Sequence, residues 1–139
     1  MEKNRWWLAI PVALGVMIIN IVIAVLWVAV YSHFIDPGHD EAYYQAYAQA
    51  SVPYSAIIAG IPLMFLAARW FGGRFPQGNS LKAALLVWLV YLVIDFSITA
   101  ASGDLGRAAV FFVVSFATKF GAAYVGGTLA QRRSAYLTR

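Results

Sequence analysis

Hydrophobic residues along the chain fall into four long runs that lack the short period of a soluble amphipathic helix or strand. A helix needs about 20 mostly apolar residues to cross the hydrocarbon core of a bilayer. Four stretches meet this length, and short polar segments separate them. The pattern predicts an all-α integral membrane protein in one domain, residues 1–139, with spans at 6–32, 52–71, 81–101 and 107–130.

The two later connections predict that neighbouring helices turn back on each other as an antiparallel four-helix transmembrane bundle. Residues 102–106 contain two glycines and leave room only for a tight turn. Residues 72–80 form a longer segment of helix-breaking residues, in which Asn79 or Ser80 is the expected cap of the third helix.

The first connection has a different pattern. Asp36-Pro37-Gly38 is typical of a turn, and Asp40 is placed to cap a following helix. We therefore expect a short interfacial helical segment over residues 41–50, before the second span. Its tyrosines, together with tryptophans at the opposite ends of the spans, are typical of the aromatic belts at membrane surfaces; an aromatic platform for a ligand is the alternative.

Basic residues are distributed unevenly between the two sides that these spans define. With the N-terminus in the cytoplasm, Arg107 stands alone on the outer side, and eight basic residues lie inside: Lys3, Arg5, Arg69, Arg74, Lys82, Arg132, Arg133 and Arg139. The positive-inside rule therefore predicts that both termini are cytoplasmic, in an inner or plasma membrane.

Composition narrows the classes of protein further. Hydrophobic residues make up 62% of the chain and charged residues 12%, about half the charged share of a soluble domain. The chain has no cysteine, which excludes thiolate nucleophiles, Cys-ligated zinc and disulfide chemistry. The net charge of +4 is explained by membrane orientation, so we expect neither nucleic-acid binding nor a cofactor.

Two ionisable residues, Asp95 and Lys119, lie within the predicted spans, where charge is costly and tends to face a partner or a cavity. At about 1.5 Å per residue, Asp95 lies roughly 9 Å and Lys119 roughly 18 Å from the outer ends of their helices. Asn20 of the first span has the depth of Lys119. The predicted intramembrane polar cluster is completed by neighbours of these residues on the same helix faces: Asn20, Tyr91, Asp95, Thr99, Ser115 and Lys119.

This cluster has several interpretations. A pair between Asp95 and Lys119 would fix which helices meet and in what register. The alternatives are an ion or proton pathway and a charge directed at a partner protein. Ser115 and Lys119 also have the i, i+4 spacing of a Ser–Lys nucleophile pair, although no oxyanion-hole motif accompanies them.

Two further features bear on function. The first connection holds five residues of metal-ligating types, His33, Asp36, His39, Asp40 and Glu41, whose spacing matches no strong metal motif. Small residues four apart mark helix-packing faces at Ala56/Gly60, Ala122/Gly126 and Ala123/Gly127, and Pro53 and Pro62 predict a kink in the second span.

Nearly the whole chain is predicted membrane helix, which leaves little aqueous surface for catalysis. The sequence therefore favours a non-enzymatic accessory or structural membrane component. Its expected partners are the lipid bilayer and either a second copy or a larger membrane complex. The alternative is a minimal oligomeric transporter or channel that uses the intramembrane Asp95, Lys119 and Asn20 cluster.

Overall fold

The computed structural model describes residues 5–76, 78–103 and 105–137. All regular structure in this part of the chain is helical. A 3-10 turn (Trp6–Leu8) precedes the first long helix and a π-helical turn (Tyr31–Ile35) continues it. The four long helices are α1 (Ala9–Val30), α2 (Glu41–Gly72), α3 (Ser80–Ser102) and α4 (Leu105–Leu137).

Each of the four helices is long and apolar enough to cross a membrane. This confirms the predicted all-helical class, with four helices of the length and composition of membrane spans. Of the residues used above to predict orientation, Lys3 and Arg139 lie outside the described residues, and the side chain of Arg107 is not described.

The second helix differs from the prediction. Residues 41–50 are not a separate interfacial segment, because α2 continues without a break from Glu41 to Gly72, through both Pro53 and Pro62. Its 32 residues make it about 48 Å long, well beyond the roughly 30 Å of a bilayer core. Residues 41–50 are thus the first turns of one long helix.

Local hydrogen bonds explain where the helices begin and end. The Asp40 carboxylate accepts a hydrogen bond from the Tyr43 backbone N–H at 3.0 Å, which confirms Asp40 as the N-cap of α2. At the start of α3, Asn79 makes no capping hydrogen bond. Ser80 instead donates its hydroxyl to the Phe75 carbonyl at 3.2 Å and so fastens the helix to the preceding loop. Gly103 ends α3 in a left-handed conformation that glycine adopts without strain.

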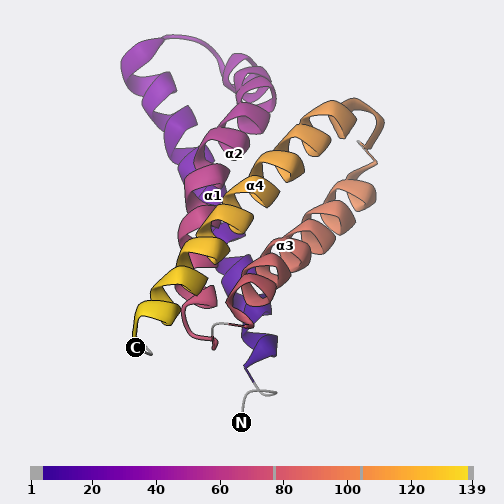
Figure 1. Ribbon diagram of the computed structural model, residues 1–139. Coiled ribbons are helices and arrows are strands. Elements are labelled where there is room, and N and C mark those ends of the chain that lie inside the picture. Colours follow the sequence, from indigo (N-terminus) through magenta and orange to yellow (C-terminus); the bar gives the residue numbers. More distant parts are fainter. Residues whose placement is uncertain (1–4, 77, 104, 138–139) are drawn as a thin grey trace.

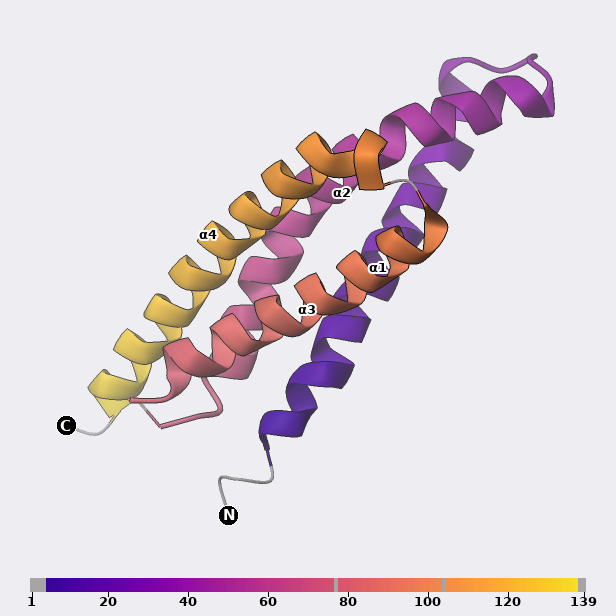
Figure 2. The same cartoon turned by 90° about the vertical axis from the view of Figure 1, so that its right-hand side faces the viewer.

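Figures 1 and 2 show the arrangement of the helices. Both ends of the chain and the α2–α3 connection lie at one end of the molecule, here called the termini end. The α1–α2 connection and the α3–α4 connection lie towards the opposite end, here called the loop end. In Figure 1 the α1–α2 pair and the α3–α4 pair draw apart towards the loop end.

Burial follows the same division. Most buried apolar side chains of the described residues lie in the half of each helix nearer the termini end, in a core that includes Met64, Ala68, Phe71, Ala84 and Ala123. Ala24 and Phe116 are buried in the other halves of α1 and α4. Backbones approach closely in the termini half. A Cβ atom on Gly126 would lie 2.6 Å from the Phe65 carbonyl oxygen, and one on Gly127 would lie 2.7 Å from Ala84 Cβ.

The small-residue faces singled out in the sequence are therefore packed inside the bundle. Gly126 of α4 faces α2, and Gly127 faces α3. Small residues at such contacts let helices come close enough for extensive van der Waals packing. In the termini half, α4 thus packs closely against α2 and α3.

Candidate functional site

Lys119 lies at the centre of the bundle with only 1% of its surface exposed. Its amine donates hydrogen bonds to the Ser115 hydroxyl at 2.8 Å and to the Tyr91 hydroxyl at 3.1 Å. The amine also lies 4.5 Å from the centroid of the Tyr91 ring, within range of a cation–π interaction. These contacts join α3 to α4 around one buried basic group.

Gly60 of α2 provides the space that the lysine stem occupies. A Cβ atom at this position would overlap Lys119 Cε, and it would lie 3.1 Å from Lys119 Nζ. The same atom would lie 3.5 Å from Asn20 Nδ2. The side chains of Lys119 and Asn20 therefore both lie against the α2 backbone at Gly60, where the absence of a side chain permits the close approach.

Asn20 brings α1 into the cluster. Its side chain is 6% exposed, and its amide nitrogen donates to the Ala56 carbonyl at 3.4 Å. Its Oδ1 atom is buried and has no hydrogen-bond partner in the described structure. A buried acceptor without a partner costs about 1–3 kcal/mol, so this oxygen favours a donor that enters the site.

Asp95 is half-buried on α3, one turn from Tyr91 on the side towards the loop end. It does not form the direct ion pair with Lys119 that the sequence suggested. Within the described residues, the ion pair found within 4.0 Å is that of His39 with Asp36. Asp95 and Lys119 still interact electrostatically over the longer distance that separates them.

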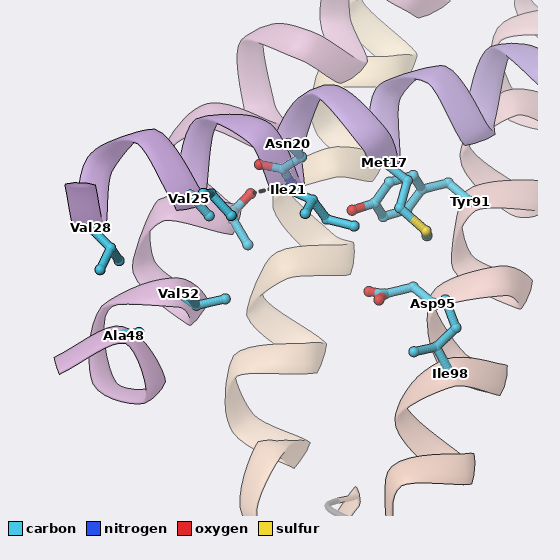
Figure 3. Close-up of a pocket in the computed structure, with 12 residues that line it drawn as sticks. Met17, Asn20, Ile21, Val25, Val28, Ala48, Val52, Tyr91, Asp95 and Ile98 are labelled. Atoms are coloured by element: carbon cyan, nitrogen blue, oxygen red, sulfur yellow. Dashed lines mark hydrogen bonds between the residues drawn. The ribbon is translucent and has the colours of Figure 1, made fainter. Parts of the chain in front are cut away.

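Two cavities meet at Asp95. The small cavity, of about 420 Å³, lies among α1, α2 and α3, and its wall includes Asn20, Tyr91 and Asp95. In Figure 3 the Tyr91 hydroxyl and the Asp95 carboxylate extend from α3 towards α1. The large cavity, of about 850 Å³, lies among α2, α3 and α4, and its wall includes Asp95, Thr99 and Ser115. The Asp95 carboxylate is thus shared between both spaces.

The structure thus separates the predicted cluster into two groups. The first group lies around Gly60, at the level where all four helices meet, and consists of Asn20, Tyr91, Ser115 and Lys119. Asp95 and Thr99 lie nearer the loop end and line cavity walls. Thr99 uses its hydroxyl to donate to the Asp95 backbone carbonyl at 2.8 Å.

Gly60 is the member of this site that sequence reasoning missed, because it was interpreted only as part of a helix-packing face. Glycine destabilises a helix interior by about 1 kcal/mol relative to alanine. At Gly60 the glycine permits close approach by a neighbouring side chain, but Gly15 and Gly121 also lie inside spans and an added Cβ atom there would have nothing within 4 Å. A glycine in the sequence therefore did not identify this site.

Ser115 Oγ and Lys119 Nζ lie 2.8 Å apart, as their i, i+4 spacing allows. This contact holds the lysine amine in place. A nucleophilic role for Ser115 stays a prediction from the sequence.

The five loop residues with metal-ligating side chains do not gather into a metal site. Within the described residues, no group of three or more such side chains is placed to share an ion. His33 contacts the Ala29 carbonyl one turn back at 2.9 Å, and Asp40 caps α2. Asp36 pairs with His39 at 3.0 Å, and the Glu41 carboxylate accepts a hydrogen bond from Gln45 at 3.1 Å.

Asp36 is the centre of a clasp between the end of the first spanning segment and the start of α2. Its carboxylate accepts hydrogen bonds from Tyr43 at 2.7 Å and from Tyr31 at 3.1 Å. These bonds, that of Tyr43 first, and the contact with His39 lower the pKa of the Asp36 carboxyl. The Tyr31 ring also stacks on Tyr47, with centroids 3.6 Å apart. The tyrosines thus hold the first connection together.

Comparison with known proteins adds no family to this description. No protein-family model matches the chain, and no match was found among curated proteins or solved structures.

Proposed function

We propose that this protein is a small membrane transporter whose solute site is formed by the small and large cavities, with Asp95 as the solute-binding carboxylate. The observation that carries the proposal is the position of Asp95. Its carboxylate lines both cavities, has no ionic partner within 4.0 Å among the described side chains, and lies on the loop-end side of the enclosed Lys119.

The cost of charge in a membrane supports this role. An acidic side chain in a span is expensive unless it faces a partner, water or a cavity. Asp95 lies seven residues before the end of α3, about 10 Å along the helix. A carboxylate that only fixed the helix register would be expected to contact Lys119 directly, whereas Asp95 faces open space instead.

The shape of the bundle supports a carrier in preference to an open channel. Both cavities lie above the tightly packed termini half, in which Gly126 and Gly127 bring α4 against its neighbours. A solute would therefore enter from the loop end and be stopped at the level of Lys119. Release on the other side requires the α1–α2 pair to move against the α3–α4 pair, as in carriers that rock two halves around a fixed site.

The proposal includes a membrane orientation. We place the helices as an antiparallel bundle in an inner or plasma membrane, with the termini end in the cytoplasm. The basis is the excess of lysine and arginine in the segments at that end, which include Arg5, Arg69, Arg74 and Lys82. The cavities then open to the outside.

An accessory role, the first expectation from the sequence, was based on the small aqueous surface that four membrane helices leave, and that reasoning applies equally to a transporter. The small-residue faces are used between helices of the same chain, where Gly60 adjoins Lys119 and Gly126 adjoins the α2 backbone. These faces therefore do not favour an accessory role over a transporter. The transporter is the function that the cavities and Asp95 support best.

Uptake by reconstituted vesicles tests the proposal. We would compare wild-type and Asp95→Asn protein with three radiolabelled probes that cross bilayers poorly: tetraethylammonium, leucine and benzenesulfonate. At least one probe is expected to enter wild-type vesicles ten times faster than Asp95→Asn vesicles. Tyr124→Phe, a change on the exposed face of α4, is the matched control and should transport like the wild type. Equal uptake of all three probes by wild-type and Asp95→Asn vesicles would overturn the proposal.

A further inference from the structure

We infer that the solute is a monovalent organic cation with an apolar body, and that it exchanges for one proton held by Lys119. The inference rests on the proposed function and names the solute class and the coupling. It follows from which charged groups face the cavities and which lie behind them.

The charge presented to a solute is negative. Asp95 lines both cavities, whereas Lys119 lines neither, because Tyr91 and Ser115 stand between its amine and the open space. Among the side chains that the structure describes, neither cavity wall holds a basic residue, so an anion would meet a carboxylate with no compensating cation. The carboxylate of a zwitterion would likewise find no basic partner among these described wall residues. A cation has a direct partner in Asp95.

The remaining walls suit an apolar body. The small cavity is lined mostly by aliphatic side chains, among them Ile21, Val25, Val52 and Ile98. Asn20, also in this wall, has its acceptor oxygen without a partner. The Asp95 carboxylate would thus hold the charge of a solute whose apolar part contacts the aliphatic wall. The volume of the small cavity, about 420 Å³, is in the range of small-molecule sites.

Proton exchange follows from charge compensation. Around the Lys119 amine, α3 contributes two titratable groups, Asp95 and Tyr91, while α1 contributes Asn20 and α2 contributes Gly60, neither of which titrates. In the empty site, the negative Asp95 offsets the positive Lys119. A cation bound to Asp95 removes this compensation and leaves a buried ammonium group unopposed. Because such a charge is strongly unfavourable in an apolar interior, Lys119 loses a proton when the cation binds.

The structure provides a route for this proton. The Lys119 amine donates to the Ser115 hydroxyl at 2.8 Å, and Ser115 lines the large cavity. The proton passes from Lys119 Nζ by way of Ser115 to water in that cavity. One positive charge enters and one leaves, so the net charge of the site does not change.

The experiment measures binding of tetraethylammonium to the full-length protein in lipid nanodiscs between pH 7 and 9. This probe is permanently charged, so any proton released comes from the protein. The affinity of the wild type is expected to rise about tenfold per pH unit until Lys119 is neutral. A pH-indicator dye should record about one proton released per bound cation on the acid side of this range.

Three comparisons complete the test. Asp95→Asn should bind at least tenfold more weakly. Lys119→Met, which keeps an unbranched apolar stem and removes the amine, should bind without the pH slope and without proton release. Benzenesulfonate should not bind. Because the wild-type proton count needs no variant, the exchange is tested even if Lys119→Met does not fold.

The outcomes separate this inference from the proposed function. Binding of tetraethylammonium that depends on Asp95 but not on pH overturns the exchange and leaves the transporter standing. Uptake of leucine or benzenesulfonate alone, dependent on Asp95, overturns the cation class and also leaves the transporter standing. If no probe depends on Asp95, the transporter itself is overturned.

Discussion

Gly60 and Lys119 pack directly against each other: the lysine stem occupies the volume that a side chain at position 60 would fill. Lys119 is 1% exposed and hydrogen-bonded at its tip, so it has little freedom to move aside. The close contact of α2 with α4 and the position of the buried amine therefore depend on each other.

Replacing Gly60 with alanine should destabilise the protein by about 1–3 kcal/mol, the range for adding atoms to a filled interior. The added methyl group overlaps Lys119 Cε. Unfolding by sodium dodecyl sulfate in mixed micelles measures the change in free energy. In a Lys119→Ala background the same change at Gly60 should cost much less. Equal costs in both backgrounds would show that the two positions are independent.

Removing the Tyr91 hydroxyl should weaken the cluster. Tyr91→Phe leaves a buried amine with one acceptor fewer, a loss of about 1–3 kcal/mol. The control is Tyr124→Phe, which removes a hydroxyl from an exposed tyrosine on α4 and should change the free energy of unfolding by less than about 0.5 kcal/mol. Similar losses in the two variants would contradict the role of the Tyr91 hydroxyl.

Helix packing in the termini half is tested by a pair of glycines on α4. A methyl group on Gly126 would lie 2.6 Å from the Phe65 carbonyl oxygen, whereas one on Gly121 would have nothing within 4 Å. Gly126→Ala should therefore destabilise by about 1–3 kcal/mol. Gly121→Ala should be neutral or stabilising by up to about 1 kcal/mol, because alanine favours the helix. The same unfolding assay applies, and a destabilising Gly121→Ala would be inconsistent with the packing described.

The clasp at Asp36 predicts a loss of stability in acid. Its pKa in the folded protein is lowered, chiefly by the hydrogen bond from Tyr43. A carboxyl with a lowered folded pKa adds stability above its unfolded pKa, near 4, and loses this contribution as the pH falls through the folded value. The melting temperature of the wild type should therefore fall more steeply below about pH 4 than that of Asp36→Asn, as followed by circular dichroism. Glu41→Gln, the control, should keep the wild-type slope.

Hydropathy and length were sufficient to predict the four spans and the all-helical class, because the bilayer demands long apolar helices whatever their packing. The cost of burying polar groups in a membrane likewise led to the prediction that Asn20 and Lys119 belong to one cluster at the same depth. The continuity of α2 was not predicted. Proline inside a spanning helix is tolerated when neighbouring groups satisfy the freed carbonyls, and this depends on tertiary contacts.

The partners of Lys119 could not be predicted for a related reason. Depth along each helix is readable from the sequence, but rotation of each helix about its axis is set by packing between helices. Tyr91 and Asp95 are one turn apart on the same face of α3, and the structure places the tyrosine hydroxyl, not the carboxylate, against the amine. The aspartate is left facing the cavities, and this difference is the basis of the proposed function.

The central claim is that Asp95 faces a solvated cavity open to one side of the membrane. The chain has no cysteine, so single cysteines can be introduced and labelled without background. The measurement is the rate at which a membrane-impermeant, positively charged thiosulfonate, added outside oriented vesicles, modifies Asp95→Cys compared with Val93→Cys. Val93 lies two residues away on α3, is 54% exposed and lines neither cavity. We predict that Asp95→Cys reacts at least a hundredfold faster. The reagent reacts with the thiolate, and the pKa of a thiol in lipid is higher than that of a thiol in water by about two units or more. Equal, slow modification of both positions would contradict the account.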